Sequence, residues 1–185
     1  MTCDWDEGPP PWAVMTPSRR AHVTRVVALL DQWADAQGVS SHERARWRRA
    51  GWLHDALKDA PLESLRGVQD AEFRDASPKL WHGPAAAARA TREGEQDAGV
   101  LAAVRYHTVG SATWDRVGHM LYLADHLEPG RPHDPRERAS LVERVAAGGD
   151  EVEAVVTLVL TRRSVHTSAD RMHPQTVAWL RTLGR

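Results

Sequence analysis

One stretch of the chain, residues 50–58, has the sequence AGWLHDALK. Its apolar residues continue a helical pattern from upstream, and Pro61 soon afterwards indicates that the helix ends. His54 and Asp55 are neighbours at this helix end. Adjacent helical residues point about 100° apart, so the two share no helix face, yet both can lean toward one point at the helix end. The stretch therefore predicts a helical fold in which other segments bring polar side chains to that point.

The rest of the chain also predicts helices. Apolar residues recur three and four positions apart between Ser18, the predicted N-cap, and Gly38, which ends this helix. The next helix begins with a capping box, Ser40 and Glu43, and runs to Pro61. Further helices are expected over about residues 80–92, 96–106, 113–127, 134–147, 151–165 and 174–183. Since no segment alternates polar and apolar residues as a strand does, the predicted fold class is all-α, a single helical bundle.

The first 17 residues contain four prolines, a glycine and three acidic residues. This composition predicts an irregular N-terminal leader over residues 1–17 and a domain over residues 18–185. The acidic start is unlike a signal peptide, and no run approaches the roughly 20 apolar residues of a membrane span. The single cysteine, Cys3, excludes a disulfide framework and fits a reducing compartment. We therefore expect a cytoplasmic protein without a membrane partner.

The charge of the chain is nearly balanced, with 24 basic and 25 acidic residues and a net charge of −1. A nucleic-acid surface would normally be clearly basic, so a nucleic-acid partner is not expected. Only Lys58 and Lys79 among the basic residues are lysines. Lys58 follows Asp55 by three residues, which suggests that a compact ammonium group serves the same point, although chance explains it too.

Tryptophan is frequent, with eight residues in 185. Trp33, Trp47, Trp52 and Trp114 lie at helical spacing and are expected in the core. Trp81 is a candidate for stacking on an adenine because it precedes a histidine, with burial in the core as the alternative reading.

Six polar residues stand in separate segments near the predicted helix ends or breaks: His22, His54, Asp55, His82, His107 and Asp125. Each alone is unremarkable, because a single histidine near a helix end more often caps the helix or bonds locally. Together, four imidazoles and two carboxylates without sulfur form a donor set suited to Fe, Mn, Co, Ni or Zn rather than Ca or Mg. The set predicts a metal centre between helices.

The order of these residues resembles the metal-binding signature of the HD superfamily of phosphohydrolases. Further motifs are similar to those of the YqeK family, which are bacterial symmetrical diadenosine-tetraphosphate hydrolases. The motifs are Arg19-x-x-His22, His54-Asp55-x-x-Lys58, His82-Gly83, Tyr106-His107-Thr108-x-Gly110, Asp125-x-x-Glu128-Pro129-Gly130-Arg131 and Met172-His173-Pro174-Gln175-Thr176. The resemblance covers about residues 18–180. The chain departs from the family pattern in three places: His126 stands in place of a lysine, Arg20 in place of an aromatic residue, and Pro132-His133-Asp134 in place of an aromatic-containing turn.

The resemblance implies a role for each residue. One divalent cation would be held by His22, His54, Asp55 and Asp125, and a second by His82 and His107, with Asp55 as the bridge. Iron is the first expectation for both ions, with Mn, Co, Ni or Zn as alternatives. Two metals can activate a water molecule and hold a phosphoryl oxygen, and Asp55, as their bridge, and Lys58, beside them, would be the catalytic residues. Substrate contacts would come from Arg19, Lys58, His82, Gly83, Thr108, Gly110 and Arg131.

The implied activity is that of a hydrolase which cleaves diadenosine tetraphosphate and related dinucleoside polyphosphates into two ADP. The alternative within the superfamily is another nucleotide phosphohydrolase: a nucleotidase, a cyclic-nucleotide phosphodiesterase or a guanosine tetraphosphate hydrolase. Two further alternatives are a non-catalytic nucleotide-binding module and an adaptor that its metal stabilises. The expected partner is a nucleotide; the oligomeric state stays open, with a homodimer as one alternative.

Overall fold

The computed structural model describes residues 5, 7–66, 71–132, 134–165 and 172–183. Within these ranges the chain forms helices, turns and bends without any β-strand, which confirms the predicted all-α class. The elements are α1 (Pro17–Ala36), α2 (Ser41–Leu53), α3 (Leu62–Leu65), the 3-10 helix η1 (Pro78–Leu80), α4 (His82–Arg92), α5 (Ala98–Tyr106), α6 (Arg116–Leu127), α7 (Pro135–Ala147), α8 (Asp150–Val165) and α9 (Pro174–Leu183). None of these described helices combines the length and the hydrophobicity that a membrane crossing requires.

The first helix begins earlier than the sequence predicted. Thr16 is its N-cap rather than Ser18, because the Thr16 hydroxyl accepts a hydrogen bond from the backbone N–H of Arg19 at 3.2 Å. Pro17 then occupies the first helical position, where its missing N–H costs nothing. As a result His22 lies in the second turn of α1 instead of at a helix end.

The second helix begins where the sequence predicted but ends earlier than predicted. The Ser40 side chain accepts a hydrogen bond from the backbone N–H of Glu43 at 3.1 Å. The expected end near Pro61 is wrong, because α2 stops at Leu53. Beyond it the backbone forms tight turns, in one of which the carbonyl of Asp55 accepts from the amide three residues later at 3.0 Å. These turns direct the side chains that follow α2 inward.

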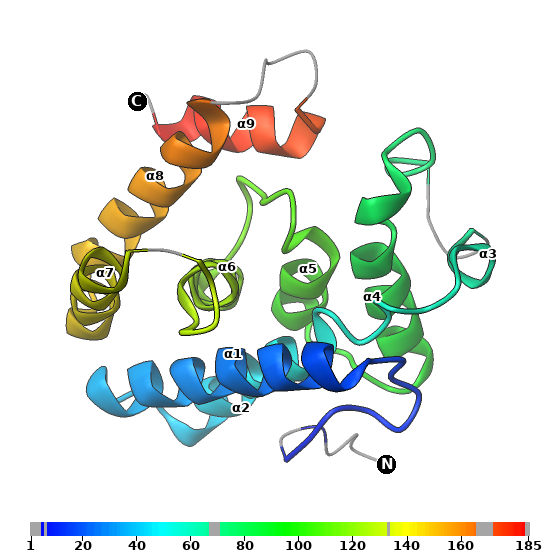
Figure 1. Ribbon diagram of the computed structural model, residues 1–185, viewed down its shortest axis with the longest axis horizontal. Coiled ribbons are helices and arrows are strands. Elements are labelled where there is room, and N and C mark those ends of the chain that lie inside the picture. The colour runs from blue at the N-terminus through cyan, green and yellow to red at the C-terminus, as the bar shows by residue number, and fades with distance from the viewer. Residues whose placement is uncertain (1–4, 6, 67–70, 133, 166–171, 184–185) are drawn as a thin grey trace.

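The helices surround a central pair, α5 and α6 (Figure 1). The helices α1 and α2 pack across one side of this pair, α4 covers a second side, and α7 and α8 lie opposite α4. The last helix, α9, inserts the Trp179 ring against Trp114 and Tyr122, with ring centroids 5.2 and 5.0 Å apart. The space between α1, α2, α4, α5 and α6 is where the predicted ligands lie.

The core contains the four tryptophans expected there, Trp33, Trp47, Trp52 and Trp114, all less than 9% exposed. Trp81 is buried as well, and its indole N–H donates to the carbonyl of Phe73 at 3.1 Å. A ring anchored in this way helps to form a second, smaller hydrophobic cluster. It offers no open face for stacking on a base, so the core alternative holds for Trp81.

The described part of the leader is irregular and lies against the domain. Trp5 is buried in the main core cluster, and Trp12 packs on that cluster. The amide of Val14 donates to the carbonyl of Ala56 at 2.7 Å, just past the predicted ligands. Residues 1–4 and 6 of the leader and residues 184–185 of the domain lie outside the described residues. The predicted boundary at residue 18 stays a prediction.

Candidate metal centre

Five helices bring the six predicted ligands together. The contributions are from α1 (His22), the end of α2 (His54, Asp55), the start of α4 (His82), the end of α5 (His107) and the last turn of α6 (Asp125). Five of these residues are buried, and the side chain of Asp125 is 18% exposed. Buried polar side chains need bonding partners, so six of them gathered at one place indicate a ligand that they share.

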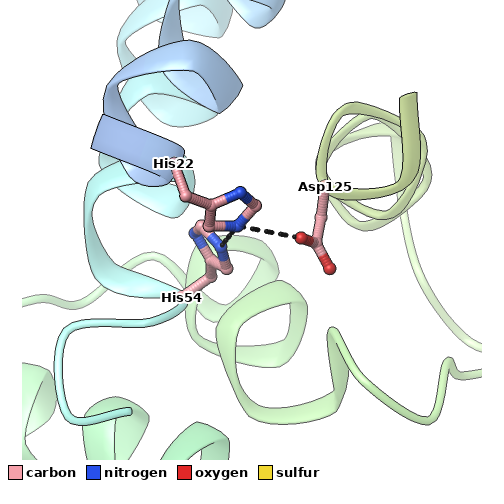
Figure 2. A group of neighbouring side chains, drawn as sticks. All are labelled: His22, His54 and Asp125. Carbon is pink, nitrogen blue, oxygen red and sulfur yellow. Dashed lines mark hydrogen bonds and ion pairs between the residues drawn. The ribbon is translucent and has the colours of Figure 1, made fainter. Parts of the chain in front are cut away.

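The first three ligands point toward one another (Figure 2). The Nε2 atom of His22 lies 3.4 Å from Nε2 of His54 and 3.1 Å from Oδ1 of Asp125. One donor atom from each residue lies within 4.8 Å of the other two. We call His22, His54 and Asp125 the first triad.

A second group of three lies beside the first. Nε2 of His82 lies 3.0 Å from Nε2 of His107, and Oδ1 of Asp55 lies 3.1 and 3.5 Å from these two nitrogens. Their donor atoms also lie within 4.8 Å of one another. We call Asp55, His82 and His107 the second triad.

Asp55 connects the two triads. Its Oδ1 belongs to the second triad, whereas its Oδ2 lies 3.8 Å from Nε2 of both His22 and His54. A carboxylate has two oxygens, so it can donate one to each of two cations. The orientation of Asp55 is the one that a bridging ligand needs.

The distances within the triads fit metal coordination. Donor atoms about 2.1 Å from a shared ion stand about 3.0 Å apart in octahedral and about 3.4 Å apart in tetrahedral geometry. Five of the six donor–donor separations within the triads run from 3.0 to 3.5 Å, and the sixth, between His54 and Asp125, is within 4.8 Å. Both triads consist of imidazole nitrogens and carboxylate oxygens, which are the donors of first-row divalent metals. The clusters therefore indicate divalent metal binding.

The four imidazoles are oriented through their other ring nitrogen. Nδ1 of His54, His82 and His107 donates to backbone carbonyls of Gly51, Lys79 and Val104 at 2.7, 2.9 and 2.7 Å. In each case the acceptor stands three residues earlier in the chain. Because a carbonyl oxygen only accepts, Nδ1 holds the proton and Nε2 presents its lone pair to the centre.

His22 is oriented by a distant carboxylate instead. Its Nδ1 lies 3.1 Å from Oε1 of Glu128, which is 1% exposed. Glu128 also accepts from the guanidinium of Arg25 and, at 2.6 Å, from the amide of Gly130. Burial alone would raise the pKa of Glu128, but these donors outweigh it and lower the pKa to about 2. The charged Glu128 therefore orients the ring of His22 in the first triad through its Nδ1, a role that the sequence did not predict.

The ionisation of the site suits cation binding. Burial lowers the pKa of His54 and of His82 to about 4, so both are neutral and free to coordinate at pH 7. Burial acts to raise the pKa of Asp55, whereas its interactions with the surrounding imidazoles, His54 first among them, hold the pKa well below its usual range. For Asp125, the opposing effect of burial is outweighed by His22, His54 and Arg131, and its pKa is also lowered. Both carboxylates are therefore charged.

Three predicted substrate-binding cations surround the centre. Nη1 of Arg19 lies 2.6 Å from Oδ2 of Asp55, and Nε of Arg131 donates to the carbonyl of Asp125 at 2.8 Å. Nζ of Lys58 lies 3.4 Å from the ring nitrogens of His82, where burial lowers its pKa. All three are close enough to meet an anion bound at the triads.

Of the remaining predicted contact residues, two glycines lie where elements pack closely, and Thr108 faces the centre. A Cβ atom on Gly83 would lie 2.8 Å from the carbonyl oxygen of Arg105, so this glycine lets α4 approach α5 and brings the second triad together. Gly110 has φ +79° and packs against Trp179. Thr108 faces the centre, with Oγ1 3.1 Å from Nε2 of His107.

The sequence pattern of the HD domain matches residues 19–145, which is more than half of the chain and includes both triads. The chain belongs to the HD domain family. Among solved structures, this HD domain is similar to a crystal structure from Clostridium acetobutylicum, described as a predicted HD superfamily hydrolase involved in NAD metabolism. The TM-score is 0.72 at 21% identity, with 91% of this chain and 92% of that one covered, so the likeness concerns the fold.

Two curated relatives of this HD domain are both named symmetrical bis(5'-nucleosyl)-tetraphosphatase. The protein from Bacillus subtilis is 32% identical over 123 residues, covering 63% of this chain and 64% of that protein. The protein from Staphylococcus aureus is 39% identical over 88 residues, covering 44% and 45%. The similarity thus spans less than two thirds of either relative.

Proposed function

We propose that this HD-domain chain is a metal-dependent phosphoanhydride hydrolase that cleaves diadenosine tetraphosphate symmetrically into two ADP. The observation that carries the proposal is the position of Asp55, which presents one carboxylate oxygen to each of two triads. The names of the curated relatives support the substrate, and related dinucleoside polyphosphates would share the site.

The cofactors of the proposed enzyme are two divalent cations. His22, His54, Asp55 and Asp125 would hold one, and Asp55, His82 and His107 the other. When bound, such ions supply water activation and charge neutralisation at a phosphoryl group. Iron is the first candidate, because imidazole and carboxylate donors suit it, and Mn, Co, Ni and Zn are the alternatives.

The residues of the chain itself position and neutralise the polyphosphate. Asp55 keeps both metal sites in register, and the Lys58 ammonium, at the edge of the second triad, stabilises charge that develops on the phosphoryl oxygens. Arg19 forms an ion pair with the carboxylate of Asp55, and Arg131 forms one with the carboxylate of Asp125. They form a cationic rim that a polyanion meets before it reaches the triads. Contacts from His82, Gly83, Thr108 and Gly110 complete the proposed substrate site.

The proposed setting is the bacterial cytoplasm, with a nucleotide as the partner and no nucleic acid or membrane involved. The chain has one cysteine and a net charge of −1. Both features fit a reducing compartment and a surface without the basic character of a nucleic-acid binder. Residues 18–185 are proposed as the folding unit, and a homodimer as the assembly to test by light scattering.

The proposal is tested with a panel of nucleotides. Purified protein is loaded with Fe²⁺ without oxygen, or with Mn²⁺, and incubated with diadenosine tetraphosphate, AMP, a cyclic nucleotide and guanosine tetraphosphate. We expect ADP as the single product from the first and little turnover of the others. If diadenosine tetraphosphate stays intact while a mononucleotide loses phosphate, the chain is a different HD phosphohydrolase.

A further inference from the structure

A carboxylate that belongs to neither triad, Asp59, lies beside the metal centre. It follows Asp55 by four residues, in the tight turns beyond α2, and its side chain is 24% exposed. The proposed hydrolysis gives Asp59 no task. Its role therefore has to be found in the contacts that each of its two oxygens makes.

One oxygen of Asp59 anchors the start of α1. Oδ2 accepts hydrogen bonds from the backbone amide and from the hydroxyl of Thr16, both at 2.8 Å. Thr16 is the N-cap of α1, and its hydroxyl also accepts from the amide of Arg19 at 3.2 Å. Close by, the amide of Val14 donates to the carbonyl of Ala56. These bonds fix the turn that carries Asp59 to the first turn of the helix that carries Arg19.

The other oxygen of Asp59 faces the guanidinium of Arg19. Oδ1 lies 3.9 Å from Nε, which is buried and has no hydrogen-bond partner among the described residues. Nη1 of the same guanidinium lies 2.6 Å from Oδ2 of Asp55. Two carboxylates thus share one guanidinium through two of its nitrogens, and the third, Nη2, bonds to none of the described residues. An arginine N–H in this position can bind a phosphate oxygen.

We propose that Asp59 is a positioning residue for Arg19: it holds the guanidinium beside the triads and leaves Nη2 for the incoming polyphosphate. The inference rests on the proposed function, because a phosphate group must bind at the triads for Arg19 to meet it. It adds a residue whose effect on the substrate passes through Arg19. An ion pair of this length near the surface contributes less than about 1 kcal/mol to stability, so the effect belongs to phosphate binding rather than to folding.

Asp59 is needed because the other partner of Arg19 has a second task. Oδ2 of Asp55 also faces His22 and His54, so a cation at the first triad competes with Arg19 for this oxygen. Oδ1 of Asp59 is a second acceptor, and a shift of the guanidinium by about 1 Å would bring Nε within hydrogen-bond distance of it. Asp59 thereby keeps Arg19 at the centre when Asp55 is engaged elsewhere.

A double-mutant cycle in the full-length, Mn²⁺-loaded protein tests the inference. Asp59→Asn keeps an oxygen for Thr16 but removes the charge that faces the guanidinium. It should weaken the binding of inorganic pyrophosphate, measured by calorimetry, about three- to tenfold, and lower kcat/KM for diadenosine tetraphosphate by a similar factor. In an Arg19→Ala background the same substitution should change either quantity by less than about twofold. Asp59→Glu, which keeps the charge, should stay within about threefold of the wild type.

Asp31→Asn is the matched control. Oδ2 of Asp31 also lies 3.9 Å from an arginine Nε, that of Arg48, which is likewise buried without a hydrogen-bond partner among the described residues. Asp31 lies on α1 nine residues beyond His22, about two and a half turns away from the centre. This variant should bind pyrophosphate and cleave diadenosine tetraphosphate like the wild type. An equal loss in Asp31→Asn and Asp59→Asn would overturn the inference, because it would show a general effect of removing a carboxylate.

The outcomes separate the inference from the proposed function. Wild-type pyrophosphate affinity in folded Asp59→Asn, or the same loss with and without Arg19, overturns the positioning role and leaves the function standing if diadenosine tetraphosphate is still cleaved. A loss that depends on Arg19, in a protein that does not cleave diadenosine tetraphosphate, upholds the positioning role and removes the function. Circular dichroism checks folding, and if Asp59→Asn does not fold, Asp59→Ser, whose hydroxyl can still accept from Thr16, replaces it in the same cycle.

Discussion

Replacing Glu128 should weaken one of the two proposed metal sites and leave the other unchanged. The carboxylate accepts from Nδ1 of His22 at 3.1 Å, from Arg25 at two nitrogens and from the amide of Gly130 at 2.6 Å. In Glu128→Gln one acceptor oxygen remains where there were two, so an N–H of the new amide faces another donor. Losing the residue that orients a metal-bound histidine typically weakens metal affinity by about 10- to 100-fold, or about 1.4–2.7 kcal/mol. We expect the low end for Gln and the high end for Glu128→Ala.

The assay isolates the first triad. Metal affinity is measured by competition with a chelator in a His82→Ala background, where the second triad is already disabled, and metal content is measured in the intact background. The matched control is Glu95→Gln, another buried carboxylate paired with an arginine, Arg49, at 2.9 Å and away from the centre. It should lower stability and leave metal affinity unchanged. Wild-type affinity in folded Glu128→Ala, or an equal loss in Glu95→Gln, would refute the reasoning.

Three further predictions concern the bridge, a loop and an ion pair. Asp55→Ala should lose ADP production and bound metal with an unchanged helical circular dichroism spectrum; retained turnover would remove Asp55 as the bridge. Gly110→Ala should lower the free energy of unfolding, measured with denaturant, by about 2–4 kcal/mol, because φ is +79° and the added methyl would lie 2.1 Å from the indole of Trp179. The control is Gly38→Ala, which has φ +60° but open space around it and should cost only about 1 kcal/mol. Burial acts to raise the pKa of Asp97, but hydrogen bonds from Arg46 and two backbone amides outweigh burial and lower the pKa. The charged carboxylate therefore stabilises the fold at pH values above its unfolded pKa of about 3.9, and this stabilisation is lost as the pH falls below that value. Asp97→Asn, which keeps the N-cap, should therefore be about 1 kcal/mol less stable than wild type in metal-free protein at pH 7, with the difference shrinking below about pH 4; a constant difference would contradict the assignment.

The fold class and the helices could be predicted because they depend on local patterns. The capping box at Ser40 and the apolar spacing of α1 are encoded within a few neighbouring residues. The errors lie where two local signals compete. Thr16 outcompetes Ser18 as the cap because Pro17 favours the first helical turn, and α2 stops before Pro61 because tight turns begin as soon as the chain reaches the centre.

The support of the site could not be predicted, because it depends on contacts between distant residues. Glu128 belongs to a quoted motif, but its bond to His22 spans 106 positions and its pairing with Arg25 spans 103. Gly83 was predicted as a substrate contact, and its close approach to the backbone of α5 is an additional role that the sequence did not indicate.

The four imidazoles are aligned in two different ways, and this makes the two halves of the centre unequal. His54, His82 and His107 are aligned by carbonyls within their own helical turn, so their aim survives as long as that turn does. His22 keeps its aim only while α1 and the end of α6 stay docked. If the two proposed metal sites are both occupied, a transient separation of these two helices would weaken the first triad and leave the second intact, so the ion at the first triad should dissociate first.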